Sequence, residues 1–186
     1  AKKTRLALEF SAEVFKVDRK VVIQAINNDK NILQFALKSY RADREIVMEA
    51  MKSNGLALQF ASKTFRADRE VVIEAVKSKG NALQYASKKL KADREVVLEA
   101  VKDFGFALEH ASYQLKEDHE VVLEAINSNW EALEFASKKL RADRKFILKF
   151  VELFKEYPNL KPFAYSSDEL KKHADFLKKD MKKNFF

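Results

Sequence analysis

Cysteine is absent from this chain of 186 residues, and glycine and proline are scarce, with three and two copies. The lack of cysteine excludes disulfides and thiolate metal sites, and it is compatible with a reducing cytosol without requiring one. Alanine, leucine and valine are spread among glutamate and lysine, a composition that favours helices over strands when glycine and proline are so few. We therefore expect an all-α protein.

Long apolar runs are also missing. No stretch reaches the roughly 18 consecutive apolar residues of a membrane-spanning helix, and the opening AKKTRLALEF lacks the apolar core and cleavage site of a secretory signal. We expect a soluble protein of the cytoplasm. A secreted effector is the alternative, because the sequence begins at Ala1 rather than Met and a targeting segment of a longer protein could precede it.

One pattern of 25 residues recurs six times without insertions. Each copy carries an aspartate and a leucine at fixed places, namely Asp18, Asp43, Asp68, Asp93, Asp118 and Asp143, and Leu8, Leu33, Leu58, Leu83, Leu108 and Leu133. A short repeat of fixed period is the signature of a solenoid, in which each unit buries its apolar face against its neighbours.

Each unit is predicted to be a pair of helices. Asp68 is placed to cap the first helix by accepting from the backbone N–H of Val71, and an apolar stripe follows at Val71, Val72, Ala75 and Val76. Gly80 is expected to end this helix in the left-handed conformation. Gly55 and Gly105 hold the same place in their copies, whereas two other copies have Lys30 and Trp130.

The second helix is predicted over residues 82–90, with an apolar stripe wide enough to pack on both sides. Connections of about two to four residues make the two helices antiparallel. The expected fold is an αα-hairpin solenoid, a right-handed superhelical array of about six 25-residue repeats over residues 1–156.

The recurring motif D-R-E-V-V-L-E-A-V-K-x-x-G-x-A-L-x-x-A-S-x-x-L carries a family resemblance over residues 7 to about 148. It resembles short helical repeats of intracellular bacteria and protists that are catalogued as a domain of unknown function. The resemblance implies a soluble helical-repeat module, often part of larger proteins that include candidate bacterial effectors, and it implies no activity.

Residues 157–186 depart from the repeat. Both prolines lie in YPNLKPF, and a helix then restarts with a capping box from Ser166 to Glu169. Its apolar side favours a terminal helix that caps the array. A helix that binds a membrane surface or a partner is the alternative, because six lysines line it.

Signatures of catalysis are missing from the sequence. It has no phosphate-binding loop, no H-E-x-x-H and no glycine-flanked serine. His110 replaces an aromatic residue on an inner helix, which favours a core imidazole over a ligand, and His119 and His173 have no metal-site spacing. The capping aspartates occur in every copy and are interpreted as structural. We expect no enzyme activity, cofactor or metal.

Charged columns are expected to form two walls. The first helices present an acidic wall of two glutamates per copy in the middle of the array, from Glu45 and Glu49 to Glu120 and Glu124. The second helices and following loops present a basic wall, formed by Lys38, Lys63, Lys88 and Lys138 with Arg41, Arg66, Lys91, Lys116 and Arg141. The basic wall is either a solvated face or a phosphate-binding surface for nucleic acid.

The turns between helices vary most from copy to copy. Phe104, Phe106 and Trp130 make the last two turns aromatic, and Tyr113 interrupts the lysine column. These four residues are the candidate partner-binding site, unless the C-terminal helix covers the turns. The predicted function is a non-enzymatic, monomeric protein–protein interaction scaffold, and a nucleic-acid-binding repeat protein is the alternative.

Overall fold

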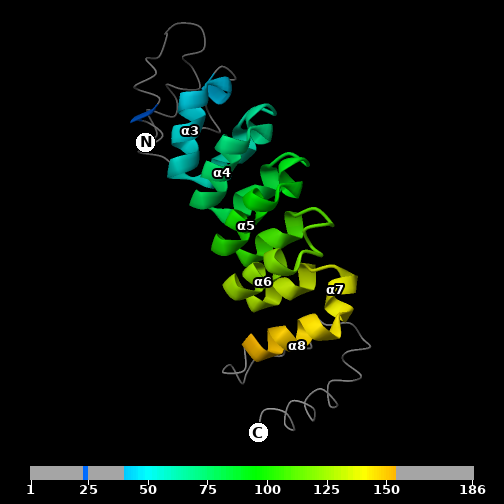
Figure 1. Cartoon of the computed structure of the whole chain (residues 1–186). Coiled ribbons are helices and arrows are strands. Elements are labelled where there is room, and N and C mark those ends of the chain that lie inside the picture. The colour runs from blue at the N-terminus through cyan, green and yellow to red at the C-terminus, as the bar shows by residue number, and fades with distance from the viewer. Residues whose placement is uncertain (1–22, 25–39, 154–186) are drawn as a thin grey trace, which may run out of the picture.

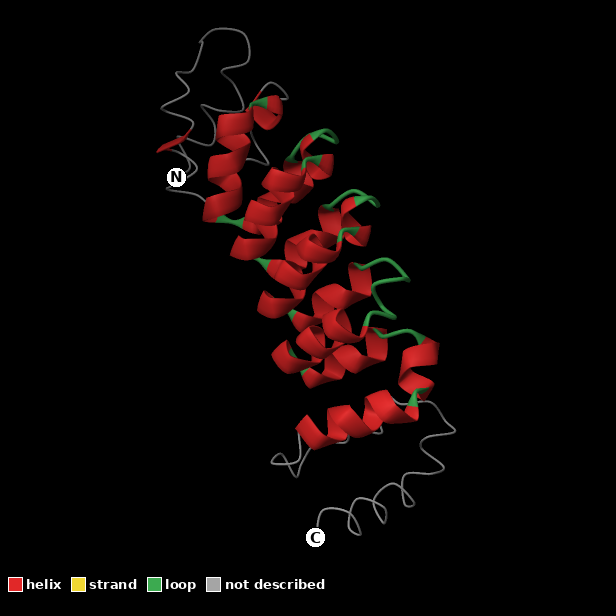
Figure 2. Cartoon of the chain, in the orientation of Figure 1, coloured by secondary structure: helices red, strands yellow, loops and turns green. Residues whose placement is uncertain are grey.

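The computed structural model describes residues 23, 24 and 40–153 of the chain, and every regular element within 40–153 is helical (Figures 1 and 2). Ten-residue α-helices start 25 residues apart and stack side by side in a row (Figure 1). Their bounds are α3 Arg44–Ser53, α4 Arg69–Ser78, α5 Arg94–Asp103, α6 His119–Ser128 and α8 Arg144–Leu153, with the shorter α7 at Lys138–Ala142. The predicted helical-repeat solenoid is confirmed. The predicted terminal helix at 157–186 lies outside the described residues.

The aspartate caps form as predicted. Oδ1 of Asp68 accepts from the backbone N–H groups of Glu70 and Val71 at 3.1 and 3.2 Å. Asp43, Asp93, Asp118 and Asp143 make the same pair of bonds in their own repeats. Every described α-helix that begins a repeat therefore starts at a satisfied cap.

The second element of each repeat differs from the α-helix predicted over 82–90. It is a six-residue 3₁₀-helix, found as η3 Gly55–Phe60, η5 Gly80–Tyr85, η7 Gly105–His110 and η8 Trp130–Phe135. An α-helix through this region would need the Ser87 N–H to bond within its own repeat. Instead Ser87 N donates to the Arg66 carbonyl of the preceding repeat at 2.8 Å, and Ala86 is extended. The bond between repeats ends the helix early.

Short elements connect each 3₁₀-helix to the next α-helix. They are the 3₁₀ turns η2 Tyr40–Ala42, η4 Phe65–Ala67 and η6 Leu90–Ala92, and α7 holds this place in the last described repeat. At residues 113–117 the chain makes a plain turn instead. These connections lie together along one edge of the array, the loop edge (Figure 2).

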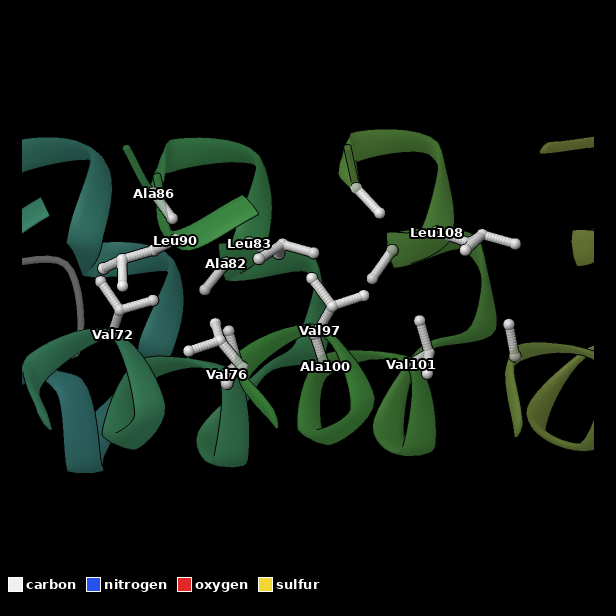
Figure 3. Close-up of a cluster of buried hydrophobic side chains, with 14 of the residues drawn as sticks. Val72, Val76, Ala82, Leu83, Ala86, Leu90, Val97, Ala100, Val101 and Leu108 are labelled. Atoms are coloured by element: carbon white, nitrogen blue, oxygen red, sulfur yellow. The ribbon is translucent and has the colours of Figure 1, made fainter. Parts of the chain in front are cut away.

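The core runs without interruption from repeat to repeat. Side chains of α4 and α5, such as Val72, Val76 and Val101, alternate along it with Leu83 and Leu108 of the 3₁₀-helices (Figure 3), and all five are fully buried. Because η5 contacts both α4 and α5, its apolar side chains belong to two repeats at once. This two-sided burial is the one that the wide apolar stripe predicts.

The prediction that the repeat glycines end the helices in the left-handed conformation is wrong. No described glycine has a positive φ. A Cβ atom at Gly80 would instead lie 2.2 Å from the Ala100 carbonyl oxygen of the next repeat, and the corresponding distances at Gly55 and Gly105 are 2.0 and 2.3 Å. The Gly80 N–H also donates to Oδ2 of Asp103 at 2.7 Å. Glycine is needed because neighbouring backbones touch.

Candidate interaction surface

The N-terminal ends of the α-helices form the first of two charged edges. Arg44 reaches into the following repeat, where Nη1 donates to Oδ2 of Asp68 at 2.5 Å and Nη2 donates to Oε2 of Glu70. The next two repeats have the same clamp, made by Arg69 with Asp93 and Glu95 and by Arg94 with Asp118 and Glu120. We call these nine residues the carboxylate ladder.

The ladder pairs three glutamates of the predicted acidic wall, Glu70, Glu95 and Glu120, with arginines. The hydrogen bond from Arg44 and the N–H of Val71 hold the pKa of Asp68 below its usual value, against the opposing effect of burial. Burial pushes the pKa of Asp93 and Asp118 upward, but backbone N–H groups and the arginines outweigh it and leave both pKa values lowered. The ladder glutamates are 72–76% exposed, so each clamp contributes modestly to stability.

The ladder stops at the junction of α6 and α8. His119 replaces the arginine, and Lys145 replaces the glutamate that the arginine would bind. The His119 ring instead packs edge-on against Phe146, with centroids 5.3 Å apart and planes at 84°. A depression of about 330 Å³ opens here, lined by His119, Glu120, Leu123, Glu124, Asn127 and Lys149.

Restoring the missing clamp is expected to stabilise this junction. The double substitution His119→Arg and Lys145→Glu supplies the arginine and glutamate at the spacing of the other clamps, and a gain of about 0.5 kcal/mol is expected for an exposed ion pair. Urea denaturation of the double variant and both single variants measures the coupling. His119→Arg alone places two cations together, so a single variant as stable as the double would contradict the ladder geometry.

A second ladder, made of backbone hydrogen bonds, runs along the loop edge. Ser62 N donates to the Arg41 carbonyl at 3.2 Å, and the Ser62 carbonyl accepts from Arg66 N at 3.0 Å. The same two bonds recur through Ser87, Ser112 and Ser137, and they link Arg66 to Lys91, Lys91 to Lys116 and Lys116 to Arg141. We call this chain of bonds the serine ladder. It joins the backbones of the residues in the predicted Arg and Lys column, which has one residue in each repeat.

Most loop-edge cations lack the carboxylate partners that the arginines of the carboxylate ladder have. Lys63, Lys88 and Lys138 are exposed, and within residues 40–153 their ammonium groups make no hydrogen bond or ion pair. Arg66 and Lys91 are half-buried and equally unpaired, and burial lowers the pKa of Lys91. Lys116 Nζ donates to the Glu109 carbonyl at 2.7 Å, and Arg141 Nε to the Ala136 carbonyl at 3.2 Å. Lys38 lies outside the described residues.

The aromatic candidates divide into separate groups. Phe104 is 37% exposed and packs edge-on against Phe106 at 5.6 Å, and Phe106 packs against Phe135 at 5.8 Å. We call these three residues the aromatic ridge. Trp130 is half-buried and packs against the core, and Tyr113 lies on the loop edge, 61% exposed. A hydrogen bond with Glu117 raises the pKa of the Tyr113 hydroxyl.

Phe135 was missing from the predicted site. It stands in a column with Phe60, Tyr85 and His110, and His110, predicted as a core imidazole, is only half-buried like the others. Burial first of all lowers the pKa of His110, and the charges of Lys91 and Lys116 lower it further against the opposing effect of Glu109. The contact with Phe106 joins residues 29 apart in sequence, so no local signal marks it.

The described residues hold no group of three or more His, Cys, Asp or Glu side chains placed to bind a metal ion. Among the same residues, no helix is both long and apolar enough to cross a membrane.

A family model for a domain of unknown function, DUF4116, matches residues 18–66, 43–91, 93–141 and 118–171. The chain belongs to this family. Each match begins at one of the repeat aspartates, and three of the four span 49 residues, so one DUF4116 unit corresponds to about two of the 25-residue repeats. The predicted family resemblance is confirmed. No curated protein and no solved structure matches the DUF4116 chain at a significant level.

Proposed function

We propose that this DUF4116 chain is a non-enzymatic scaffold that binds another protein at the aromatic ridge. The observation that carries the proposal is the exposure of Phe104 at a position that is polar in the neighbouring repeats. The aligned residues are Asn54, Lys79 and Asn129. A phenylalanine here is not needed to form the repeat, since three other repeats form without it. Exposed aromatic side chains are frequent anchors of protein interfaces.

Ring contacts also hold the aromatic ridge in place. Phe104 rests on Phe106, and Phe106 rests on Phe135 of the next repeat. The exposed ring is therefore held by an edge-on contact with a ring that is itself packed edge-on against Phe135, which lowers the entropy lost when a partner covers it. The repeat that carries Phe104, residues 93–117, also differs from its neighbours at His110, Tyr113 and Glu117. Such asymmetry suits a specific contact better than uniform columns do.

The charge of the described array favours a protein over nucleic acid. Residues 40–153 carry 20 Lys and Arg against 19 Asp and Glu, a net charge of +1, although the whole chain has +8. Strong nucleic-acid binding relies on a dense field of cations. It also uses open aromatic faces for base stacking, whereas Phe60, Tyr85 and Phe135 are partly buried against the core.

Peptide display tests this function. A library of random peptides is selected on the full chain, and the enriched sequences are measured by fluorescence anisotropy on three proteins: wild type, Phe104→Glu and Lys79→Glu. Lys79 is the matched control, because it occupies the same place one repeat earlier and is exposed. We expect a consensus peptide whose affinity falls at least about tenfold with Phe104→Glu and stays unchanged with Lys79→Glu. The proposal would be overturned if selection gave no consensus peptide, or if Phe104→Glu left the affinity of the consensus peptide unchanged.

A further inference from the structure

We propose that the loop edge is a second binding surface, which takes an acidic segment of a partner protein in polyproline II conformation with a carboxylate at every third residue. The inference rests on the proposed protein-binding function but uses other residues. They are the cationic stripe, formed by Lys63, Arg66, Lys88, Lys91, Lys116, Lys138 and Arg141.

The stripe is chosen by the contrast between the two charged edges. In the carboxylate ladder, which begins directly after the loop-edge turns, each clamping arginine binds two carboxylates of the next repeat. On the loop edge, Lys63, Arg66, Lys88 and Lys91 make no ion pair within residues 40–153. Like charges repeated without counter-charges repel one another, so an acidic ligand gains attraction there without breaking an existing pair.

The stripe is also held at a regular spacing. The serine ladder joins the backbones of Arg66, Lys91 and Lys116 through two hydrogen bonds per step, of 2.8 to 3.0 Å. Lys63 and Arg66 are three residues apart on one helical turn, as are Lys88 and Lys91, so each of these repeats offers a pair of cations to one side. Because the cations stand on a hydrogen-bonded backbone, a bound ligand meets a preformed row.

The spacing selects the conformation of the ligand. Packed helices lie about 8–10 Å apart, which sets the step from one cation pair to the next. Polyproline II has three residues per turn and a rise of about 3.1 Å, so every third residue faces the same way at intervals of about 9 Å. Same-side residues of a β-strand recur at about 6.6–6.8 Å and fall out of register with the cations.

A nucleic acid fits the same row less well. The phosphates of one DNA strand follow each other at about 3.4 Å along the duplex axis, so one step of the stripe would pass about three of them. Exposed Glu109 and Glu134 lie on the 3₁₀-helices and would repel a continuous polyanion more than a segment with spaced carboxylates.

The stripe is interrupted in the repeat that carries the aromatic ridge. Tyr113 replaces the exposed lysine, and Glu117 stands where Ala67, Ala92 and Ala142 stand in other repeats. Glu117 also lies 3.9 Å from Lys139, so it adds a counter-charge inside the row. The variant Glu117→Ala restores the residue of the other repeats and is expected to strengthen binding of an acidic segment.

The test compares two labelled peptides of equal composition by fluorescence anisotropy with the full chain. One has five Glu-Pro-Pro units, and the other has five glutamates followed by ten prolines. The spaced peptide is expected to bind about tenfold more tightly than the clustered one. Lys88→Glu with Lys91→Glu should weaken it at least tenfold, Lys77→Glu with Lys79→Glu should leave it unchanged, and Glu117→Ala should tighten it. The single variant Lys88→Glu repeats the binding measurement with a substitution at an exposed residue only.

Several outcomes would overturn the inference. Equal binding of the two peptides contradicts the spacing, and loss of binding with the Lys77/Lys79 variant as well as the Lys88/Lys91 variant contradicts the location. Labelled oligouridine that binds more tightly than the spaced peptide and depends on Lys88 would assign the stripe to nucleic acid. If the spaced peptide does not bind but a consensus peptide from display still depends on Phe104, only the second binding surface is wrong. If neither peptide binds as expected, the proposed protein-binding function is wrong as well.

Discussion

Gly80→Ala is expected to destabilise the array by about 3 kcal/mol, at the upper end of overpacking substitutions. The added methyl group would lie 2.2 Å from the Ala100 carbonyl oxygen and 3.0 Å from both N and Cβ of Phe104. Two of these three atoms belong to the backbone, so no side-chain rotation relieves the clash. The two repeats must move apart, and the bond from Gly80 N–H to Asp103 is weakened at the same time.

Urea denaturation followed by circular dichroism measures the effect of Gly80→Ala. Lys79→Ala is the control, because its exposed side chain is adjacent in sequence and outside the contact. The control is expected to lie within about 0.5 kcal/mol of wild type. A loss below about 1 kcal/mol for Gly80→Ala would mean that the backbones at Gly80 and Ala100 are farther apart in solution than the structure shows.

Features inside one repeat were predictable from the sequence because their signals are local. The cap at Asp68 and the stripe of Val71, Val72 and Ala75 lie within one helix, and they formed as predicted. The polar contacts between repeats were missed. Arg44 meets Asp68 and Glu70 across 24 and 26 positions. No rule of helix periodicity connects residues so far apart.

One signal for these contacts was present all the same. The arginine and glutamate columns break at the same junction, where His119 replaces the arginine and Lys145 replaces the glutamate of one clamp. Paired departures of this kind indicate residues that meet. The error over Gly80 has a different cause. A glycine after a helix fits both a left-handed cap and a close approach of two backbones, and only the neighbouring repeat decides between them.

The candidate site was predictable in part. Phe104 and Tyr113 are exposed, whereas Phe106 and Trp130, which the sequence also placed in the candidate site, are half-buried against the core. The pairing state of the charges was not predictable, because columns of glutamate and of lysine look equally exposed in sequence. Interactions across repeats distinguish them: Glu70 has an arginine partner, while Lys88 and Lys91 have none within residues 40–153.

Leu83→Ala is expected to cost about 3 kcal/mol and to weaken the cooperativity of unfolding. Leu83 is fully buried, and such truncations lose transfer free energy and leave a cavity. Its element, η5, contacts both α4 and α5, so the cavity lies where one repeat joins the next. In a solenoid, stability is close to a sum of repeat terms and interface terms, and a weakened central interface lets the two halves unfold separately.

Leu133→Ala is the matched control for this effect. Leu133 holds the same place in η8 and is equally buried, but it lies nearer the end of the described array. Both variants should lose similar stability. Only Leu83→Ala should produce two resolved transitions or a clearly reduced dependence on urea, because only there does the weak interface divide the array into two sizeable parts. A single transition of wild-type steepness in Leu83→Ala would contradict additive coupling between neighbours, and it would mean that cooperativity spreads beyond adjacent repeats.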